Sequence, residues 1–501
     1  MNTDSAPSFL PIDWAAPALP FRPTWAGLGN VDQFRWLTRA DLRKQLALAR
    51  DELGLRHVRA CAMYSPELRV WTHALPDWSK PAKDRTKGPN WQIVDECIEG
   101  LLELGLKPIY TTCFFPADFL PASNTCWPDR NPIDLPPNLD QWAEFVTEGI
   151  RHHIRRFGPE EVRSWYFECW NEPNLNHFFG GDRDDFFRLW SATWKAVKAA
   201  DPSLRFGGPS TARGEWIPEF LDFTAGDGTP PDYLVTHVYN NDSEAAPLSP
   251  FDGPASHRVK DSPHFASGVV RGLRAELDRR GWRGEVHWNE WGRSWFPHDP
   301  LRETALEGAF IVKTMAEVSQ LADSFAFWCL SDIYDQVGYQ SSEFQGHYGM
   351  LSLHGLRKPA WLAHQWLQRL GPRRFASHPI NPLTDAIATL REGGGAVLCY
   401  AYPESIEDTK GSVQFELPLP RGARSPRLIR LGRIENNVAA AWRALGSPPY
   451  PTRAQLHALR SSEVQTEASF LLLSPRDPNG GVVMSFTLER PGVALVEFDL
   501  D

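Results

Sequence analysis

Residues 164–174 read Ser-Trp-Tyr-Phe-Glu-Cys-Trp-Asn-Glu-Pro-Asn, and this short stretch is the clearest local indication of the fold. It is largely apolar and aromatic up to Trp170, as a buried strand is, and then breaks into the polar turn Asn171-Glu172-Pro173. A second stretch of the same character, residues 285–292, carries Glu290 near its end. Apolar strands that end in polar residues are typical of a parallel sheet that gathers its polar groups at one edge.

The sequence around these two stretches repeats the alternation of a short strand with a longer amphipathic helix. Strands are expected at residues 24–27, 56–62, 108–113, 164–170, 205–208, 233–238, 285–290 and 325–330. Helices are expected at residues 41–52, 91–104, 139–157, 184–200, 303–321 and 359–370, where apolar residues recur at three- and four-residue steps. Eight such units close into a barrel more naturally than they spread into an open sheet. The expected fold class is therefore α/β, a (β/α)8 TIM barrel.

After residue 370 the helical pattern gives way to short alternating runs punctuated by Pro and Gly. These runs, expected to be antiparallel strands, are residues 395–402, 412–417, 427–431, 469–473, 482–488 and 493–498. Their spacing predicts a β-sandwich packed against the barrel. The expected domains are residues 1–370, a barrel with a short N-terminal extension, and residues 371–501, the sandwich.

Composition narrows the class of protein. The chain has 501 residues, 42% hydrophobic and 23% charged, which suits a globular protein with a large core. A net charge of −10 without a basic cluster argues against nucleic acid as a partner. Seven cysteines without a CxxC pair favour a reducing compartment, and the N-terminal residues lack a signal-peptide pattern, so a cytoplasmic location is expected. No apolar run is long enough for a membrane span, and no pattern favours one oligomeric state.

The two strand ends predict a specific chemistry. Hydrolysis of a glycosidic bond with retention needs two carboxyl groups about 5 to 5.5 Å apart, one protonated and one ionised. Glu172 and Glu290, at the ends of the fourth and seventh expected strands, can supply them as general acid/base and nucleophile. A single strand-end glutamate is more often a surface ion-pair partner, and it is the pair that favours catalysis. The 21 Trp are compatible with an oligosaccharide substrate, because aromatic faces pack on sugar rings, although Trp also fills large cores.

The stretch WYFECWNEPNL at residues 165–175 resembles the acid/base signature of glycoside hydrolase family 39. Further motifs follow in the family's order: Gly207-Gly208-Pro209, His237-Val238-Tyr239, Glu290, and the run from Ser324 to Asp332. In the C-terminal part, Arg433-Ile434, Asn436-Asn437 and Tyr450-Pro451-Thr452 are similar to a family-specific segment. The resemblance extends from about Pro23 to the end of the chain.

The resemblance implies a retaining exo-glycosidase, with β-xylosidase as the best-populated activity. No cofactor is expected, and no metal, because no cluster of His, Cys and carboxylates at ligand spacing is seen near the two strand ends. Besides Glu172 and Glu290, it assigns substrate contacts. Asn171 would bind the sugar 2-hydroxyl, His237 and Tyr239 would stand beside the nucleophile, and Trp328 would be the platform of the deepest subsite. Phe179 would line the entrance, and Asp335 would take the place of one of two adjacent glutamates that bind sugar hydroxyls. Taken alone, His237 and Trp328 are as readily structural residues of the core.

Two departures from the family's pattern bear on the preferred sugar. The chain reads Arg59-Ala60-Cys61-Ala62 where xylosidases of the family tend to have a histidine, and Asp335-Gln336 where the family often has two glutamates. Losing groups that hydrogen-bond particular hydroxyls shifts specificity strongly. Three functions therefore stay open: release of β-D-xylose from xylo-oligosaccharides, release of arabinose or of an arabinose-containing disaccharide, and sugar binding without catalysis.

Overall fold

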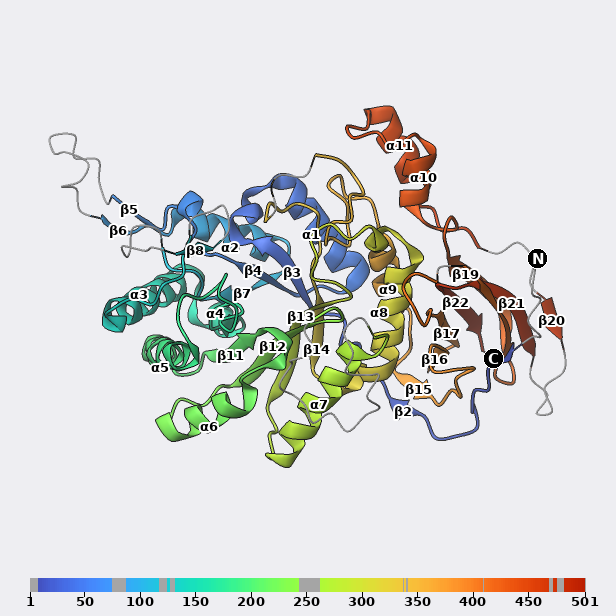
Figure 1. Ribbon diagram of the computed structural model, residues 1–501, viewed down its shortest axis with the longest axis horizontal. Coiled ribbons are helices and arrows are strands. Elements are labelled where there is room, and N and C mark those ends of the chain that lie inside the picture. The colour runs from blue at the N-terminus through green and yellow to red at the C-terminus, as the bar shows by residue number, and fades with distance from the viewer. Residues whose placement is uncertain are drawn as a thin grey trace.

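An eight-stranded parallel barrel forms the centre of the molecule (Figure 1). The computed structural model describes residues 8–73, 87–116, 124–126, 131–242, 262–336, 338, 341–408, 410–467, 472–474 and 482–500. The barrel strands are β3 (Leu28–Gln33), β4 (His57–Cys61), β7 (Lys107–Thr111), β10 (Tyr166–Glu168), β11 (Arg205–Thr211), β12 (Tyr233–Tyr239), β13 (Glu285–Gly292) and β14 (Ser324–Phe327). The first and last meet where the Leu330 N–H donates to the Asn30 carbonyl at 2.8 Å. The expected TIM barrel is confirmed.

Helices surround the barrel on its outer side (Figure 1). They are α1 (Ala40–Leu53), α2 (Gln92–Glu103), α3 (Leu139–Phe157), α4 (Pro159–Arg163), α5 (Arg183–Ala200), α6 (Ile217–Asp227), α7 (Phe265–Arg279), α8 (Ala305–Val318) and α9 (Pro359–Leu367). Helix α3 shows why they form. Trp142, Phe145, Val146 and Ile150 recur at helical steps and are buried on the barrel side. Its first turn is capped by Asn138, whose side chain accepts a hydrogen bond from a backbone N–H of that turn.

The C-terminal part consists of two packed sheets, as expected. The six-stranded sheet has the order β19-β22-β17-β16-β15-β2, and the four-stranded sheet has the order β1-β18-β21-β20. Their C-terminal strands are β15 (Arg373–Phe375), β16 (Thr384–Arg391), β17 (Gly394–Ala401), β18 (Ser412–Pro418), β19 (Arg424–Leu431), β20 (Leu472–Ser474), β21 (Val483–Glu489) and β22 (Gly492–Asp499). Val397 and Val496 from one sheet meet Phe415 and Met484 from the other in a shared buried core.

The N-terminal residues are paired with this sandwich. β1 (Ser8–Phe9) runs parallel to β18, and β2 (Leu19–Pro20) runs antiparallel to β15. The chain thus makes its first strand pairings with C-terminal strands before it enters the barrel. The division at residue 370 stays a prediction.

Helix α8 joins the two parts of the molecule. Unlike an ordinary surface helix it is buried almost all round, because one side faces the barrel and the other faces the six-stranded sheet (Figure 1). A Cβ added at Gly308 would lie 2.7 Å from Leu431 of β19. The glycine therefore lets the sheet pack closely against this helix.

Several elements differ from the expectation. Residues 24–27 form a turn, and the first barrel strand is β3. This strand was not recognised because Asn30, Asp32 and Gln33 are polar although they are buried inside the barrel. The central strand β16 and the helices α10 (Val438–Ala444) and α11 (Arg453–Ser461), which project at the top of Figure 1, were not expected. Short pairs β5 (Trp71–His73) with β6 (Lys87–Pro89), and β8 (Thr125–Cys126) with β9 (Asn131–Pro132), lie in barrel loops. Of the expected strand 469–473, residues 469–471 lie outside the described residues.

Close packing between β11 and β12 gives a test of the barrel. Gly207 stands opposite Tyr233, and a Cβ at Gly207 would overlap the tyrosine ring. We expect Gly207→Ala to lower the free energy of unfolding by about 1–3 kcal/mol, the usual cost of overpacking a core. Chemical denaturation measures it. Gly226→Ala in α6, where a Cβ meets nothing within 4 Å, is the control and should be neutral or stabilising. Equal stability of the two variants would contradict the packing described here.

Candidate active site

The two predicted carboxyl groups lie at the same end of the barrel. Glu290 is the sixth residue of β13, and Glu172 lies in the loop that follows β10. That loop is held to β11 because the Glu172 N–H donates to the Ser210 carbonyl at 2.8 Å. The backbone of Glu172 has φ +45°, a left-handed conformation that a non-glycine residue keeps only when its surroundings impose it. The fold therefore fixes where the Glu172 side chain points.

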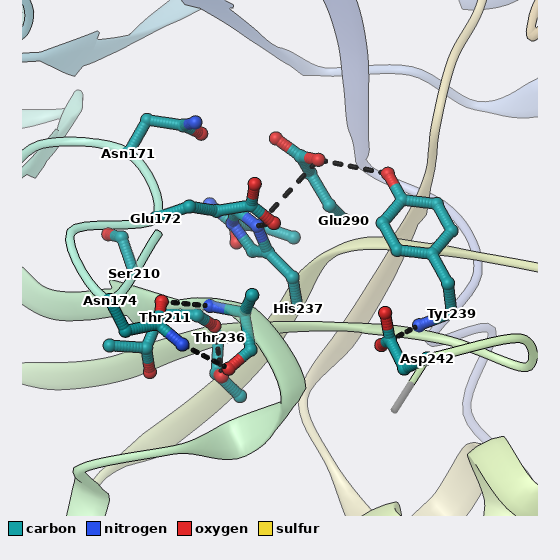
Figure 2. A network of polar contacts seen from close by, with 12 residues as sticks. Asn171, Glu172, Asn174, Ser210, Thr211, Thr236, His237, Tyr239, Asp242 and Glu290 are labelled. Atoms are coloured by element: carbon teal, nitrogen blue, oxygen red, sulfur yellow. Dashed lines mark hydrogen bonds and ion pairs between the residues drawn. The ribbon is translucent and has the colours of Figure 1, made fainter. Parts of the chain in front are cut away.

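The side chains of Glu172 and Glu290 converge over His237 of β12 (Figure 2). His237 Nδ1 lies 2.9 Å from Glu172 Oε1 and 3.7 Å from Glu290 Oε2. One oxygen of each carboxyl and a ring nitrogen of His237 all lie within 4.8 Å of one another. The hydroxyl of Tyr239 donates to Glu290 Oε2 at 3.0 Å. The sequence prediction that these residues share one site is consistent with this geometry.

A buried arginine ties the strands together beneath the carboxyl pair. Arg59 of β4 donates to Glu290 Oε1 at 2.6 Å, to both oxygens of Glu168, and to Asn171 Oδ1 at 2.8 Å. Glu168 also accepts from Ser210 and from Asn289. Arg59 and Glu168 have essentially no exposed surface, so every charge here is paired inside the protein. The network fixes the orientation of Glu290 and of Asn171.

Burial shifts the protonation of the site toward the forms that acid catalysis needs. It raises the pKa of Glu172 to about 7, against the opposing effect of Arg59 and Arg213. It also raises the pKa of Glu290, but Arg59 and the Tyr239 hydroxyl favour the ionised form. Burial lowers the pKa of His237 to about 4, so its ring is neutral near pH 7.

A cavity of about 820 Å³ opens above the carboxyl pair. Its walls include both carboxyl groups and three of the six predicted substrate contacts, together with residues from several loops: Asn171, Glu172, Leu175, His177, Phe178, Ala212, Arg213, Tyr239, Asn241, Asp242, Glu290, Trp295, Pro297, Trp328, Gln336 and Tyr348. The predicted platform Trp328 is among them. Such a volume is within the range of pockets that bind small ligands.

Three predicted contacts lie outside the cavity wall. His237 is completely buried and reaches the site only through the carboxyl groups. Phe179 is buried against Trp170, and its neighbour Phe178 faces the cavity instead. Asp335 is engaged by Arg35, which donates to both its oxygens at 2.7 Å, while Gln336 lines the cavity. Substrate contacts by Phe179 and Asp335 stay predictions that these placements do not favour.

Sequence reasoning did not assign Arg59, Glu168, Asp242 or Trp295 to the site. Arg59 and Glu168 stand inside expected strands, where a charged residue signals a buried ion pair. Asp242 and Trp295 stand in loops after β12 and β13, and only the rule that barrel loops at this face carry function could have indicated them.

The site also places a histidine and two carboxyl groups at metal-ligand spacing, which the sequence had not revealed. Glu172, His237 and Glu290 form this group, and a second one, Asp95, His152 and His153, lies between α2 and α3. In the active site the Arg59 guanidinium stands 2.6 Å from a Glu290 oxygen and would repel a cation placed there. These three residues are therefore better suited to catalysis by the two carboxyl groups themselves than to binding a metal ion.

A (β/α)8 barrel with two buried glutamates facing each other at the ends of its fourth and seventh strands defines a glycosidase of the barrel type. Comparisons with known proteins agree. The family model described as glycosyl hydrolases family 39 matches residues 10–469. The chain belongs to this family, is an O-glycosyl hydrolase, and acts on a carbohydrate substrate.

The chain is similar to two bacterial β-xylosidases. The one from Caldicellulosiruptor saccharolyticus is 30% identical over 443 residues, which cover 86% of each chain. The one from Geobacillus stearothermophilus is 26% identical over 488 residues, 96% of this chain and 93% of that protein. A crystal structure of a monomeric β-xylosidase from Caulobacter crescentus CB15 has a TM-score of 0.81 and 26% identity, covering 98% of this chain and 99% of that one. Among the described helices, none is long and apolar enough to cross a membrane.

The raised pKa of Glu172 makes the stability of the protein depend on pH. The folded protein keeps a proton on Glu172 up to about pH 7, whereas the unfolded chain loses it near 4.5. The stability that Glu172 contributes is therefore present below pH 4.5 and is lost as the pH rises to 7, by about 1.4 kcal/mol for each pH unit. The variant Glu172→Gln lacks this loss of stability. The difference between its Tm and the Tm of the wild type should therefore increase as the pH rises from 4.5 to 7.

Differential scanning calorimetry at several pH values measures this gain. Glu103→Gln, at an exposed position of α2, is the matched control and should keep a constant offset from the wild type. A constant offset for Glu172→Gln as well would show that Glu172 is not protonated in the folded protein.

Proposed function

We propose that the protein is a retaining exo-glycosidase that releases a terminal pentose, most specifically β-D-xylose from xylo-oligosaccharides, by double displacement. The observation that carries the proposal is the spacing of the carboxyl groups, with an oxygen of Glu172 and one of Glu290 within 4.8 Å. Retaining enzymes hold these groups about 5 to 5.5 Å apart, whereas inverting enzymes need about 6.5 to 9.5 Å to admit a water molecule. The shorter spacing supports direct attack by one carboxylate.

In the first step Glu290, ionised beside Arg59, attacks the anomeric carbon and forms a glycosyl ester. Glu172, with its pKa raised to about 7, gives its proton to the departing oxygen. In the second step Glu172 takes a proton from water, which cleaves the ester and restores both groups. Asn171, held by Arg59, is oriented to bind the sugar 2-hydroxyl, and Trp328 offers its face to the ring.

The xyloside assignment rests on the named activity of the two bacterial relatives that cover most of the chain. The mechanism uses side chains only, so no cofactor or metal is required. Cys61, Cys97, Cys113, Cys169, Cys329 and Cys399 are buried and form no disulfide within the part of the chain that the structure describes, which supports the expected cytoplasmic location as part of this proposal. The partner is then a short oligosaccharide already inside the cell.

One observation favours an arabinoside as the second candidate substrate. At the position where the family often places carboxylates, the cavity wall presents the amide of Gln336, which donates to Asp32 at 2.7 Å. Cys61 is buried against Asn171, so it replaces a histidine without offering a comparable group to the sugar. Both changes alter the contacts that distinguish one pentose from another.

A panel of para-nitrophenyl glycosides separates the two candidates. We expect kcat/KM to be highest for β-D-xylopyranoside, with α-L-arabinosides at least about tenfold lower, equivalent to about 1.4 kcal/mol in transition-state binding. Preference for an arabinoside would replace the first candidate by the second. Absence of turnover on every glycoside and on arabinose-capped disaccharides would leave only sugar binding without catalysis.

Two variants test the roles of the carboxyl groups. Glu172→Ala should slow xylosides with poor leaving groups by at least about 100-fold and activated aryl xylosides much less, because the latter need little protonation. Glu290→Ala should abolish covalent labelling by a 2-fluoro sugar, measured by intact-protein mass spectrometry, while Glu215→Ala on a neighbouring loop should still be labelled. Equal losses on both kinds of leaving group, or labelling of the Glu290 variant, would refute the assignment.

A further inference from the structure

The cavity extends beyond the space needed for the terminal sugar, and its outer part has walls of its own. The residues around Glu290 are nearly inaccessible, with Tyr239 and Trp328 each 6% exposed. Trp295 in contrast is 47% exposed and still lines the cavity, so it stands at the mouth. A volume of about 820 Å³ leaves room in front of a single pentose ring.

Trp295 is held firmly although it is exposed. Its backbone N–H donates to Asn241 Oδ1 at 2.9 Å, and its indole N–H donates to the Asn241 carbonyl at 3.2 Å. Its carbonyl accepts from the Tyr348 hydroxyl at 2.6 Å. These contacts join the loops after β12 and β13. A large exposed ring that the protein fixes in place is what a sugar-stacking platform requires.

Asp242 directly follows Asn241, the residue that holds Trp295, and it also lines the cavity. Its Oδ2 accepts from the Tyr239 N–H at 2.7 Å (Figure 2), and among the described residues its other oxygen has no hydrogen-bond partner. Asp242 and the catalytic acid Glu172 both line the cavity. The acid must face the leaving oxygen, and the leaving group must lie toward the open mouth, where Trp295 stands.

We propose that Trp295 and Asp242 form a leaving-group subsite that takes a second sugar ring. The ring stacks on the Trp295 indole, and one of its hydroxyls hydrogen-bonds Asp242 Oδ1, which has no partner among the described residues. This inference rests on the proposed glycosidase mechanism and adds the two residues that hold the leaving-group sugar. Burial raises the pKa of Asp242 to about 7, so near neutrality its carboxyl can donate or accept this hydrogen bond.

The test compares two substrates with the same terminal sugar: a disaccharide, whose leaving group fills the subsite, and the glycosyl fluoride, whose leaving group does not. Trp295→Ala should lower kcat/KM on the disaccharide about tenfold, as expected for a lost stacking contact, and on the fluoride less than about twofold. Trp295→Phe keeps a ring and should lose less. Asp242→Asn keeps the acceptor for the Tyr239 N–H and should lower the disaccharide value about 3- to 10-fold.

Phe296→Ala is the matched control, because Phe296 is 53% exposed beside Trp295 and does not line the cavity. It should change neither substrate. Equal losses on disaccharide and fluoride, or no loss on either, would overturn the subsite while leaving the glycosidase proposal intact. If the wild-type protein cleaves neither substrate, the proposed function itself fails. Melting curves of each variant establish that the loss is not one of folding.

Discussion

A single buried guanidinium is the constraint on which the active site depends. Arg59 has no exposed surface, and its nitrogen atoms link β4 to two other barrel strands, to β10 and its loop through Glu168 and Asn171 and to β13 through Glu290. Taking such charges out of water is costly, and the cost is offset only when each finds a partner in good geometry. Removing Arg59 would leave two carboxylates in the interior without a positive partner, which would lower the free energy of unfolding by about 3–5 kcal/mol. The side chains of the site are therefore fixed by the same interactions that hold the barrel interior together.

The same network explains how two glutamates in one small space take different protonation states. Burial alone would raise the pKa of both. Glu290, however, accepts from Arg59 at 2.6 Å and from the Tyr239 hydroxyl at 3.0 Å, whereas the hydrogen-bond partner of the Glu172 side chain among the described residues is the neutral His237. Glu290 therefore receives the contacts that stabilise a negative charge, and Glu172 is the carboxyl group that keeps its proton. This asymmetry is what a double displacement requires of its nucleophile and its acid.

Much of this could be predicted from the sequence, because it depends on local patterns. The helix α3 was predicted to the residue from its apolar steps, and the strand ends at Glu172 and Glu290 from a change of polarity. Strand β3 was missed because its buried face is polar, and polar burial depends on partners such as Asn289 that lie far away in the chain. Arg59 was read only as a departure from a family motif for the same reason. An ion pair between residues far apart in the chain produces no periodic pattern in the sequence around either residue.

The departures at Cys61 and Gln336 show how such a site can change its substrate without changing its chemistry. Neither residue touches the carboxyl pair, and both stand at the edge of a network whose centre is saturated with hydrogen bonds. A substitution at Arg59 or Glu168 would leave a buried charge unpaired, whereas one at Gln336 changes a polar group of the cavity wall and one at Cys61 changes a contact of Asn171. The carboxyl pair is thus tied to the interactions that stabilise the barrel, and these two positions lie outside that pair. For this reason the class of reaction follows from the fold and the carboxyl pair, while the choice among sugars depends on the groups that meet the sugar.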